Sequence, residues 1–185
     1  MRVISGKFGG RRFYPPADNW PTRPTTDFAK EALFNILQNM FDFGEVRYLD
    51  LFGGTGSHSI EMISRGCEDV TYVDKFRGCV KFVSGMARDL EIKDSIKVIH
   101  DDVFKFCKRP GVGQFDYIFA GPPYPLPNLG DIPNLIFDNN LLANGGVFVL
   151  EHSRIWSFSD HACFTDIRKY GLCHFSLFKN AAELA

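Results

Sequence analysis

A glycine-rich turn directly follows an apolar run in Tyr48-Leu-Asp-Leu-Phe-Gly-Gly-Thr-Gly56. Glycines in such a turn let the backbone approach a ligand closely and open the following helix. The dinucleotide fingerprint G-x-G-x-x-G is broken, because the third position counted from Gly54 and Gly56 is Ser59. The third glycine and the helix N-terminus serve a pyrophosphate. The turn therefore favours a nucleotide without pyrophosphate, such as S-adenosylmethionine, and disfavours the alternative of an NAD oxidoreductase.

Acidic residues follow the next two apolar runs. Asp74 lies about 20 residues after Gly54, where an acidic side chain would hold ribose hydroxyls. Asp102, in His100-Asp-Asp-Val103, ends the third run, where a side chain would meet an adenine edge. Asp102 could instead be only the N-cap of a short helix over 103–107. Together these sites lie at the carboxyl ends of successive expected strands, which is where open α/β sheets bind ligands.

The fourth apolar run ends in Gly121-Pro-Pro-Tyr124. Two prolines fix the chain and remove two N–H donors, which leaves carbonyl groups facing solvent or substrate. An aromatic ring at this point can stack on a planar base. The alternatives are a loop stiffener or a proline-rich ligand for another domain. The position of Pro122-Pro-Tyr124 directly after an expected buried strand argues against an exposed linear motif.

The N-terminal stretch is basic and aromatic. Residues 1–12 contain Arg2, Lys7, Arg11 and Arg12 and no acidic residue, and they are interleaved with Phe8. Basic residues between aromatic ones suit the phosphates and base faces of RNA. The stretch is interpreted as a phosphate-contacting arm, with a solvated irregular arm as the alternative.

The pattern of apolar runs indicates how these residues are positioned. Short runs alternate with amphipathic stretches of helical length, which is typical of a parallel sheet covered on both faces. The end of the chain differs and indicates an antiparallel pair. Strands are expected at 46–52, 70–73, 96–99, 117–120, 147–150, 163–168 and 172–179, and helices at 26–37, 57–65, 79–91 and 132–142. The organisation expected is a basic N-terminal extension over 1–28 and a single α/β domain over 29–185.

Composition excludes several classes of protein. The 185 residues carry a net charge of −1, with 45% hydrophobic and 23% charged residues, so the chain is neither a polycation nor wholly disordered. No apolar run approaches the roughly 18 residues that span a bilayer, and the N-terminus lacks the apolar region of a secretory signal. The five cysteines are scattered without a C-x-x-C pair, which is typical of reduced core residues. We therefore expect a cytoplasmic protein with no membrane segment and no metal site.

Combined, these motifs resemble the RsmD family of bacterial 16S rRNA guanine-N2 methyltransferases over essentially the full length. The residues that carry the resemblance are Arg2-Val-Ile-Ser-Gly6, Thr22-Arg-Pro-Thr-Thr26, Lys30-Glu-Ala-Leu-Phe-Asn35, Leu49-Asp-Leu-Phe-Gly-Gly-Thr-Gly56, Val73-Asp74, Asp101-Asp-Val103, Pro122-Pro-Tyr124 and Arg168-Lys-Tyr-Gly171. The glycine turn and Pro-Pro-Tyr are shared by many methyltransferases, whereas the N-terminal motifs are more specific.

The resemblance implies a Rossmann-like seven-stranded sheet whose last strand is antiparallel. It also implies transfer of a methyl group from S-adenosylmethionine to the N2 amine of a guanine in 16S rRNA or a partially assembled 30S subunit. We expect the protein to act as a monomer. The residues expected to bind cofactor are Asp50, Phe52, Gly54, Gly56, Asp74 and Asp102. The residues expected at the reacting base are Gly121, Pro122, Pro123 and Tyr124, and those expected to bind RNA are Arg2, Lys7, Arg11, Arg12 and Arg23.

One position departs from the family pattern, which is Asp-Pro-Pro-Tyr: this chain has Gly121 where the Asp stands. In the family that carboxylate accepts a hydrogen bond from the target amine, and loss of such a positioned group typically costs about 10²–10⁴-fold in rate. An alternative function is therefore a catalytically weakened paralogue that binds cofactor and RNA without efficient turnover. A further possibility is that a water molecule or a main-chain carbonyl replaces the carboxylate as the acceptor.

Overall fold

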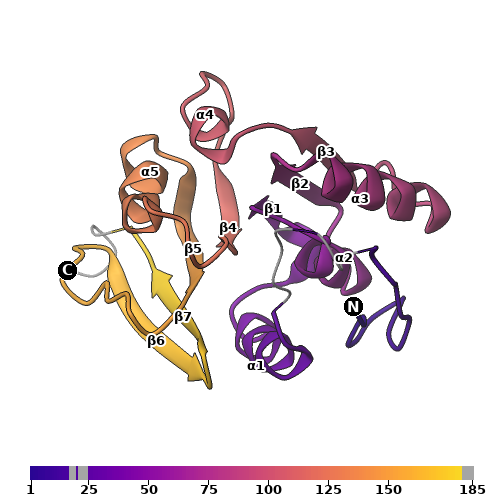
Figure 1. Cartoon of the computed structure of the whole chain (residues 1–185), viewed down its shortest axis with the longest axis horizontal. Coiled ribbons are helices and arrows are strands. Elements are labelled where there is room, and N and C mark those ends of the chain that lie inside the picture. Colours follow the sequence, from indigo (N-terminus) through magenta and orange to yellow (C-terminus); the bar gives the residue numbers. More distant parts are fainter. Residues whose placement is uncertain (17–19, 21–24, 181–185) are drawn as a thin grey trace.

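A single mixed sheet forms the centre of the protein (Figure 1). The structure, a computed structural model, describes residues 1–16, 20 and 25–180. The described strands lie in the order β3-β2-β1-β4-β5-β7-β6, and β7 alone among them runs opposite to the others. Their bounds are β1 Arg47–Leu51, β2 Asp69–Asp74, β3 Ile96–His100, β4 Phe115–Ala120, β5 Leu142–His152, β6 Phe164–Tyr170 and β7 Cys173–Phe178. The seven-stranded sheet with an antiparallel last strand is thus confirmed.

Helices cover both faces of the sheet. Figure 1 shows α1, α2 and α3 on one face and α4 and α5 on the other, in agreement with two separate apolar cores. The central strands are buried on both faces, which explains why they read as continuous apolar runs rather than alternating ones. The helices are α1 Asp27–Leu37, α2 Ser57–Ser64, α3 Arg77–Asp89, α4 Val103–Cys107 and α5 Ile132–Asp138, with 3-10 turns η2 Phe43–Glu45 and η3 Leu129–Asp131.

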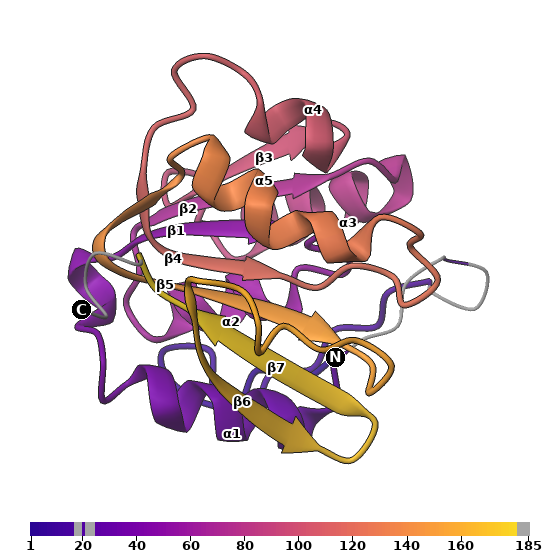
Figure 2. The same ribbon diagram turned by 90° about the vertical axis from the view of Figure 1, so that its left-hand side faces the viewer.

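The parallel strands all end at one edge of the sheet. Figure 2 shows the arrowheads of β1, β4 and β5 directed to the same side. The register Leu51↔Val73 and Leu51↔Ala120 brings the ends of β1, β2 and β4 level with one another. The loops that follow these strands therefore meet, as the sequence patterns predicted.

The N-terminal segment is docked onto the domain. Val3 and Phe8 belong to the apolar core that also contains α1 and α2. Glu61 of α2, which is fully buried, accepts hydrogen bonds from the amides of Ile4 (2.7 Å) and Ser5 (3.0 Å). The part of the arm over residues 1–8 is consequently a packed element, and the expected boundary after residue 28 falls inside the first turn of α1.

Two expected bounds were wrong. The helix expected over 132–142 ends at Asp138, because Asn140 has a positive φ of 50° and starts the turn into β5. The apolar Leu141 and Leu142, which had extended the helical pattern, lie just before and at the first residue of β5 instead. The strand expected over 147–150 is much longer, and β5 runs through Gly145 and Gly146.

The five cysteines are all buried and form no disulfide. Within the described ranges, no helix is long and apolar enough to cross a membrane. Among the same residues, His, Cys, Asp and Glu side chains form no group of three or more that could hold a metal ion.

Candidate active site

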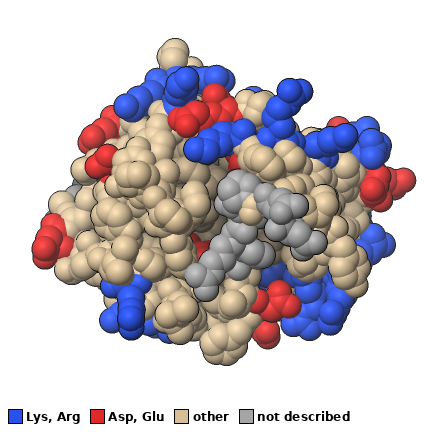
Figure 3. Space-filling model, viewed as in Figure 1, with Lys and Arg blue, Asp and Glu red and all other residues tan. Residues whose placement is uncertain are grey.

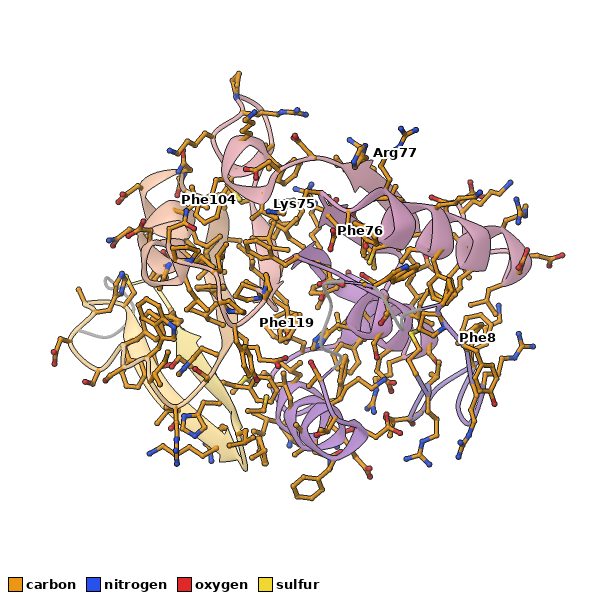
Figure 4. All side chains as sticks on the ribbon, viewed as in Figure 1. Phe8, Lys75, Phe76, Arg77, Phe104 and Phe119 are labelled. Carbon is orange, nitrogen blue, oxygen red and sulfur yellow. The ribbon has the colours of Figure 1, made fainter. Side chains whose placement is uncertain are left out.

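A pocket opens at the carboxyl edge of the parallel strands. The residues around it come from the ends of β1, β2 and β4 and the loops that follow them, from the first turn of α2, from the end of β5, and from the segment just before α1. Figure 4 shows Lys75 and Phe76 at the end of β2 and, in this view, Phe119 between them and α1. The lining residues are Thr25, Asp50, Phe52, Gly53, Gly54, Thr55, Ser57, His58, Asp74, Lys75, Phe76, Phe119, Gly121, Pro122, Pro123, Tyr124 and Glu151.

The glycine turn after β1 is held in a conformation that most residues avoid. Phe52, Gly54 and Gly56 have positive φ values of 57°, 53° and 72°. A Cβ on Gly56 would also lie 2.8 Å from Cγ2 of Val83, so both conformation and space require glycine there. The hydroxyl of Tyr72 donates to the carbonyl of Gly54 at 2.6 Å. Contacts within the protein therefore hold the turn in its conformation.

Asp50 lies fully buried beneath this turn. Its Oδ2 accepts a hydrogen bond from the hydroxyl of Ser59 at 2.5 Å, which accounts for the serine at the third fingerprint position. Burial raises the pKa of Asp50 to about 7. Its Oδ1 is buried without a well-formed hydrogen bond among the described residues, and the hydroxyl of Tyr48 lies beside the carboxylate, where it favours the ionised form. A buried acceptor of this kind at the wall of a pocket fits a ligand that carries a cationic donor, such as the ammonium group of S-adenosylmethionine.

Asp74 closes the other side of the turn. Its Oδ2 accepts from the amide of Gly54 at 2.8 Å, and its Oδ1 accepts from the amide of Phe76 at 2.7 Å. Burial raises the pKa of Asp74, while these two amide bonds oppose the rise. The carboxylate is thereby oriented along the pocket wall, where its further acceptor positions suit vicinal hydroxyl groups.

Asp102 lies outside the residues that line the pocket. Its Oδ1 accepts from the amide of Lys105 at 3.2 Å, so the side chain is the N-cap of α4. Asp102 therefore caps α4, which is one of the two roles expected for it from the sequence. Phe104, the second residue of α4, packs edge-on against Phe52, with ring centroids 6.2 Å apart. Through that contact α4 supports the strained residue of the glycine turn.

The opposite end of the pocket is aromatic and contains one carboxylate. The amide of Gly121 donates to the carbonyl of Leu51 at 3.1 Å, which anchors the start of Pro122-Pro-Tyr124. The hydroxyl of Tyr124 donates to Oε1 of Glu151 at 3.2 Å. Thr25 donates its hydroxyl to Oε2 of the same carboxylate. Glu151 is 6% exposed.

A stacked pair forms the floor between the two ends. The rings of His58 and Phe119 lie parallel, with centroids 4.0 Å apart. Nε2 of His58 is 2.9 Å from the hydroxyl of Tyr117. Burial lowers the pKa of His58 well below its usual value, so the imidazole is neutral and serves as an apolar wall.

The basic residues of the arm lie on the surface beside the pocket. Figure 3 shows Lys and Arg gathered at the lower right, over the N-terminal segment. Lys7, Arg11 and Arg12 are exposed, and Arg2 pairs with Asp27 at 3.1 Å. A groove lined by Arg2, Arg12, Tyr14 and others also contains Thr25 and Ser57, which it shares with the pocket. Arg23 lies outside the described residues.

Several lining residues were not among the expected site residues. Thr25 stands inside a quoted motif without an assigned role, whereas His58, Phe76 and Glu151 were missed altogether. Glu151 could have been found, because it follows the buried run 147–150 as Asp74 follows 70–73. His58 and Phe76 lie inside ordinary helical and loop patterns and carry no comparable signal.

The chain is similar to known families and proteins. The family profile described as conserved hypothetical protein 95 matches residues 1–179. A protein of Bacillus subtilis (strain 168) named "Putative rRNA methyltransferase YlbH" is 36% identical over 156 residues, which cover 83% of each chain. "Ribosomal RNA small subunit methyltransferase D" of Escherichia coli (strain K12) is 28% identical over 151 residues, covering 82% of this chain and 74% of the relative.

Among solved structures, a 16S rRNA N2 G1207 methyltransferase of T. thermophilus, in complex with AdoMet and guanosine, superimposes with a TM-score of 0.65. The match is 20% identical and covers 85% of this chain and 44% of that one. At this identity the likeness establishes a shared fold.

Proposed function

This chain belongs to the RsmD-type family, whose profile is described as conserved hypothetical protein 95, and we propose that it transfers a methyl group from S-adenosylmethionine to the N2 amine of a guanine in small-subunit rRNA. The observation that carries the proposal is one pocket with two chemically different ends. The glycine turn with Asp50 and Asp74 forms one end, and Pro122-Pro-Tyr124 forms the other. A pocket of this kind can hold a nucleoside-like donor and a planar acceptor base together.

At the end formed by the glycine turn, which we call the donor end, each side chain would have one role in holding the methyl donor. Asp50 would hold the ammonium of the methionine part, because its carboxylate lines the pocket and its buried Oδ1 makes no well-formed hydrogen bond among the described residues. Asp74 would accept from the ribose hydroxyls, and Gly54 and Gly56 would admit the methionine chain close to the backbone. Phe52 and Asp102 would lie toward the adenine. When bound, the cofactor supplies a methyl group on a sulfonium centre.

The end formed by Pro122-Pro-Tyr124, which we call the acceptor end, would position the base. The carbonyl of Pro122 would accept a hydrogen bond from the exocyclic amine, and Gly121 and Pro123 would fix that carbonyl. The ring of Tyr124 would stack on the base, which must leave its own stack to enter the pocket. Alignment of the amine with the methyl group contributes through proximity, and exclusion of water by Phe119 and His58 strengthens each polar contact.

The RNA would approach over the arm. Arg2, Lys7, Arg11 and Arg12 would contact phosphates, Arg23 is proposed to do so as well, and the groove beside the exposed ring of Tyr14 leads to Thr25. We propose that a monomer acts on 16S rRNA or a partially assembled 30S subunit. The relatives named as rRNA methyltransferases give no support to the weakened-paralogue alternative.

The test is transfer of a tritiated methyl group from labelled S-adenosylmethionine to 30S particles assembled on transcribed, and therefore unmethylated, 16S rRNA. Incorporation that needs both protein and RNA supports the proposal. Binding of cofactor without incorporation would restore the paralogue alternative. Binding of NAD in place of S-adenosylmethionine would overturn the assignment of the donor end.

A further inference from the structure

The acceptor end of the pocket keeps a carboxylate although the expected Asp is absent. Gly121 offers no side chain, yet Glu151 lines the pocket together with Gly121, Pro122 and Tyr124. Glu151 is 6% exposed, so the side chain is directed to the pocket wall rather than to bulk solvent. A carboxylate at this position needs an explanation, because burial of a charge is costly unless it meets donors.

The sheet register places Glu151 beside the empty position. Ala120 of β4 pairs with Leu150 of β5, so the next residue along each strand is Gly121 and Glu151. Neighbouring strands lie about 4.8 Å apart, and register partners in a parallel pair direct their side chains to the same face. Phe119 and Val149, two residues earlier, both belong to the core on the α1 face. A side chain at 121 and the side chain of Glu151 therefore point to the same face from adjacent strands.

The carboxylate is held in place by its neighbours. Tyr124 donates to Oε1 at 3.2 Å, and the hydroxyl of Thr25 donates to Oε2. These two bonds fix the direction in which the carboxylate oxygens face. The side chain whose ring is proposed to stack on the base is thus hydrogen-bonded to the carboxylate through its hydroxyl.

We propose that Glu151 recognises the target guanine and accepts hydrogen bonds from its N1–H and N2–H groups, in the role that Asp at position 121 would otherwise have; this rests on the proposed function. N1–H and N2–H are adjacent donors on one edge of guanine, and a carboxylate is the matching pair of acceptors. Adenine presents an acceptor at N1 and is rejected by the same group.

The acceptor also assists the reaction. The lone pair of N2 forms the new N–C bond while the C–S bond breaks and its electron pair returns to sulfur, which leaves S-adenosylhomocysteine. The N2–H proton then passes from the methylated amine to the carboxylate of Glu151 and on to water. A positioned acceptor that strengthens as the amine becomes positive is worth about 10²-fold or more in rate.

The experiment removes the carboxylate from position 151 at the end of β5 and places one at position 121 after β4. Glu151→Gln keeps the shape of the side chain, and we expect turnover on transcript-derived 30S particles to fall about 10²-fold or more at unchanged cofactor affinity. Adding Gly121→Asp to that variant should restore much of the loss, whereas Gly121→Asp alone should give no gain. The new Cβ lies 3.1 Å from Cε1 of Phe119, so the ring must shift by a few tenths of an ångström. Glu68→Gln, at an exposed position before β2, is the matched control.

A second measurement needs no cofactor. Titration of the protein with guanosine and with inosine, which lacks the N2 amine, should show about a tenfold preference for guanosine in the wild type. Glu151→Gln should abolish that preference, and Gly121→Asp/Glu151→Gln should regain it. Glu151→Asp keeps the charge and serves if the glutamine variant unfolds, with an intermediate preference expected.

The outcomes separate the two proposals. A wild type that methylates RNA together with an equally active Glu151→Gln would overturn the role of Glu151 alone. A wild type that transfers no methyl group would overturn the proposed function, and the guanosine titration would still decide whether Glu151 reads the base. A preference for guanosine that survives Glu151→Gln contradicts the inference.

Discussion

Asp74 shows how one side chain organises both the protein and its ligand. Its two oxygens accept from the amides of Gly54 and Phe76, and they would also accept from the ribose. We expect Asp74→Ala to weaken S-adenosylmethionine binding by about 1–3 kcal/mol, because charge-assisted hydrogen bonds are lost. Isothermal titration calorimetry gives the affinity, and Asp74→Asn, which keeps one acceptor oxygen, should be intermediate. Unchanged affinity in the alanine variant would remove Asp74 from the site.

Asp50 couples cofactor binding to pH. Its folded pKa of about 7 is above the usual 3.8, so between those values the folded protein holds a proton that the unfolded chain has lost. The contribution of this group to stability is therefore complete below pH 3.8 and is lost as pH rises toward 7. A cationic ligand beside the carboxyl favours the ionised form and should expel the proton. We expect cofactor affinity to increase as pH rises through 7.

Calorimetry in buffers of different ionisation enthalpy measures that proton directly. Near pH 6.5 the wild type should release a fraction of a proton on binding S-adenosylmethionine, and Asp50→Asn should release less. Identical proton release in the two proteins would show that Asp50 does not face the ammonium group.

At the scale of elements, a buried ion cluster joins the N-terminal arm, α1 and α2. Glu61 pairs with Lys30 at 3.3 Å and with Arg65 at 2.9 Å while it accepts from the arm. Burial lowers the pKa of Lys30, and Glu61 opposes that change. Lys30 also donates to the carbonyl of Arg2 at 2.6 Å. The cluster therefore holds the arm at the side of the pocket.

Glu61→Gln should destabilise the fold by about 3–5 kcal/mol, because it leaves the Lys30 charge buried without its partner. Urea denaturation measures the free energy of unfolding. The double variant Lys30→Met/Glu61→Gln removes both charges and should recover a substantial part of the loss. If the double variant is as unstable as the sum of its single changes, the two charges are not coupled.

The elements that sequence could predict are those with a strong apolar period. β1, β2 and β3 and helices α1 and α2 were expected within one or two residues, since their burial produces the pattern directly. The start of β5 could not be predicted, because Gly145 and Gly146 interrupt the apolar run and the pairing with β4 supplies what propensity does not. In the same way, the glycine turn and Asp74 follow from spacing, whereas the approach of Glu151 to Gly121 depends on strand register.

At the scale of the whole molecule, the chain is near neutral but its charge is unevenly distributed. Arg2 and Arg12 of the arm line the groove that shares Thr25 and Ser57 with the pocket, and the cations of the arm gather on the surface over the N-terminal segment. Because cations on RNA displace counterions, replacing Arg11 and Arg12 together by Ala should reduce the slope of log affinity against log salt by roughly 0.7 per contact removed. Filter binding to 16S rRNA over a salt series measures the slope.

The control with the same charge change is the double variant Lys93→Ala/Lys97→Ala, at exposed positions before and in β3. An equal effect of both pairs would mean that the arm is not the contact surface.

The atom that receives the methyl group defines the proposed activity. The direct measurement is mass spectrometry of nucleosides released from transcript-derived 30S particles after incubation with the protein and S-adenosylmethionine bearing a deuterated methyl group. The expected result is a single labelled product, N2-methylguanosine, which approaches one per 16S rRNA and is absent without the protein. Label in any other nucleoside, or none in RNA while the cofactor binds, would contradict the assignment.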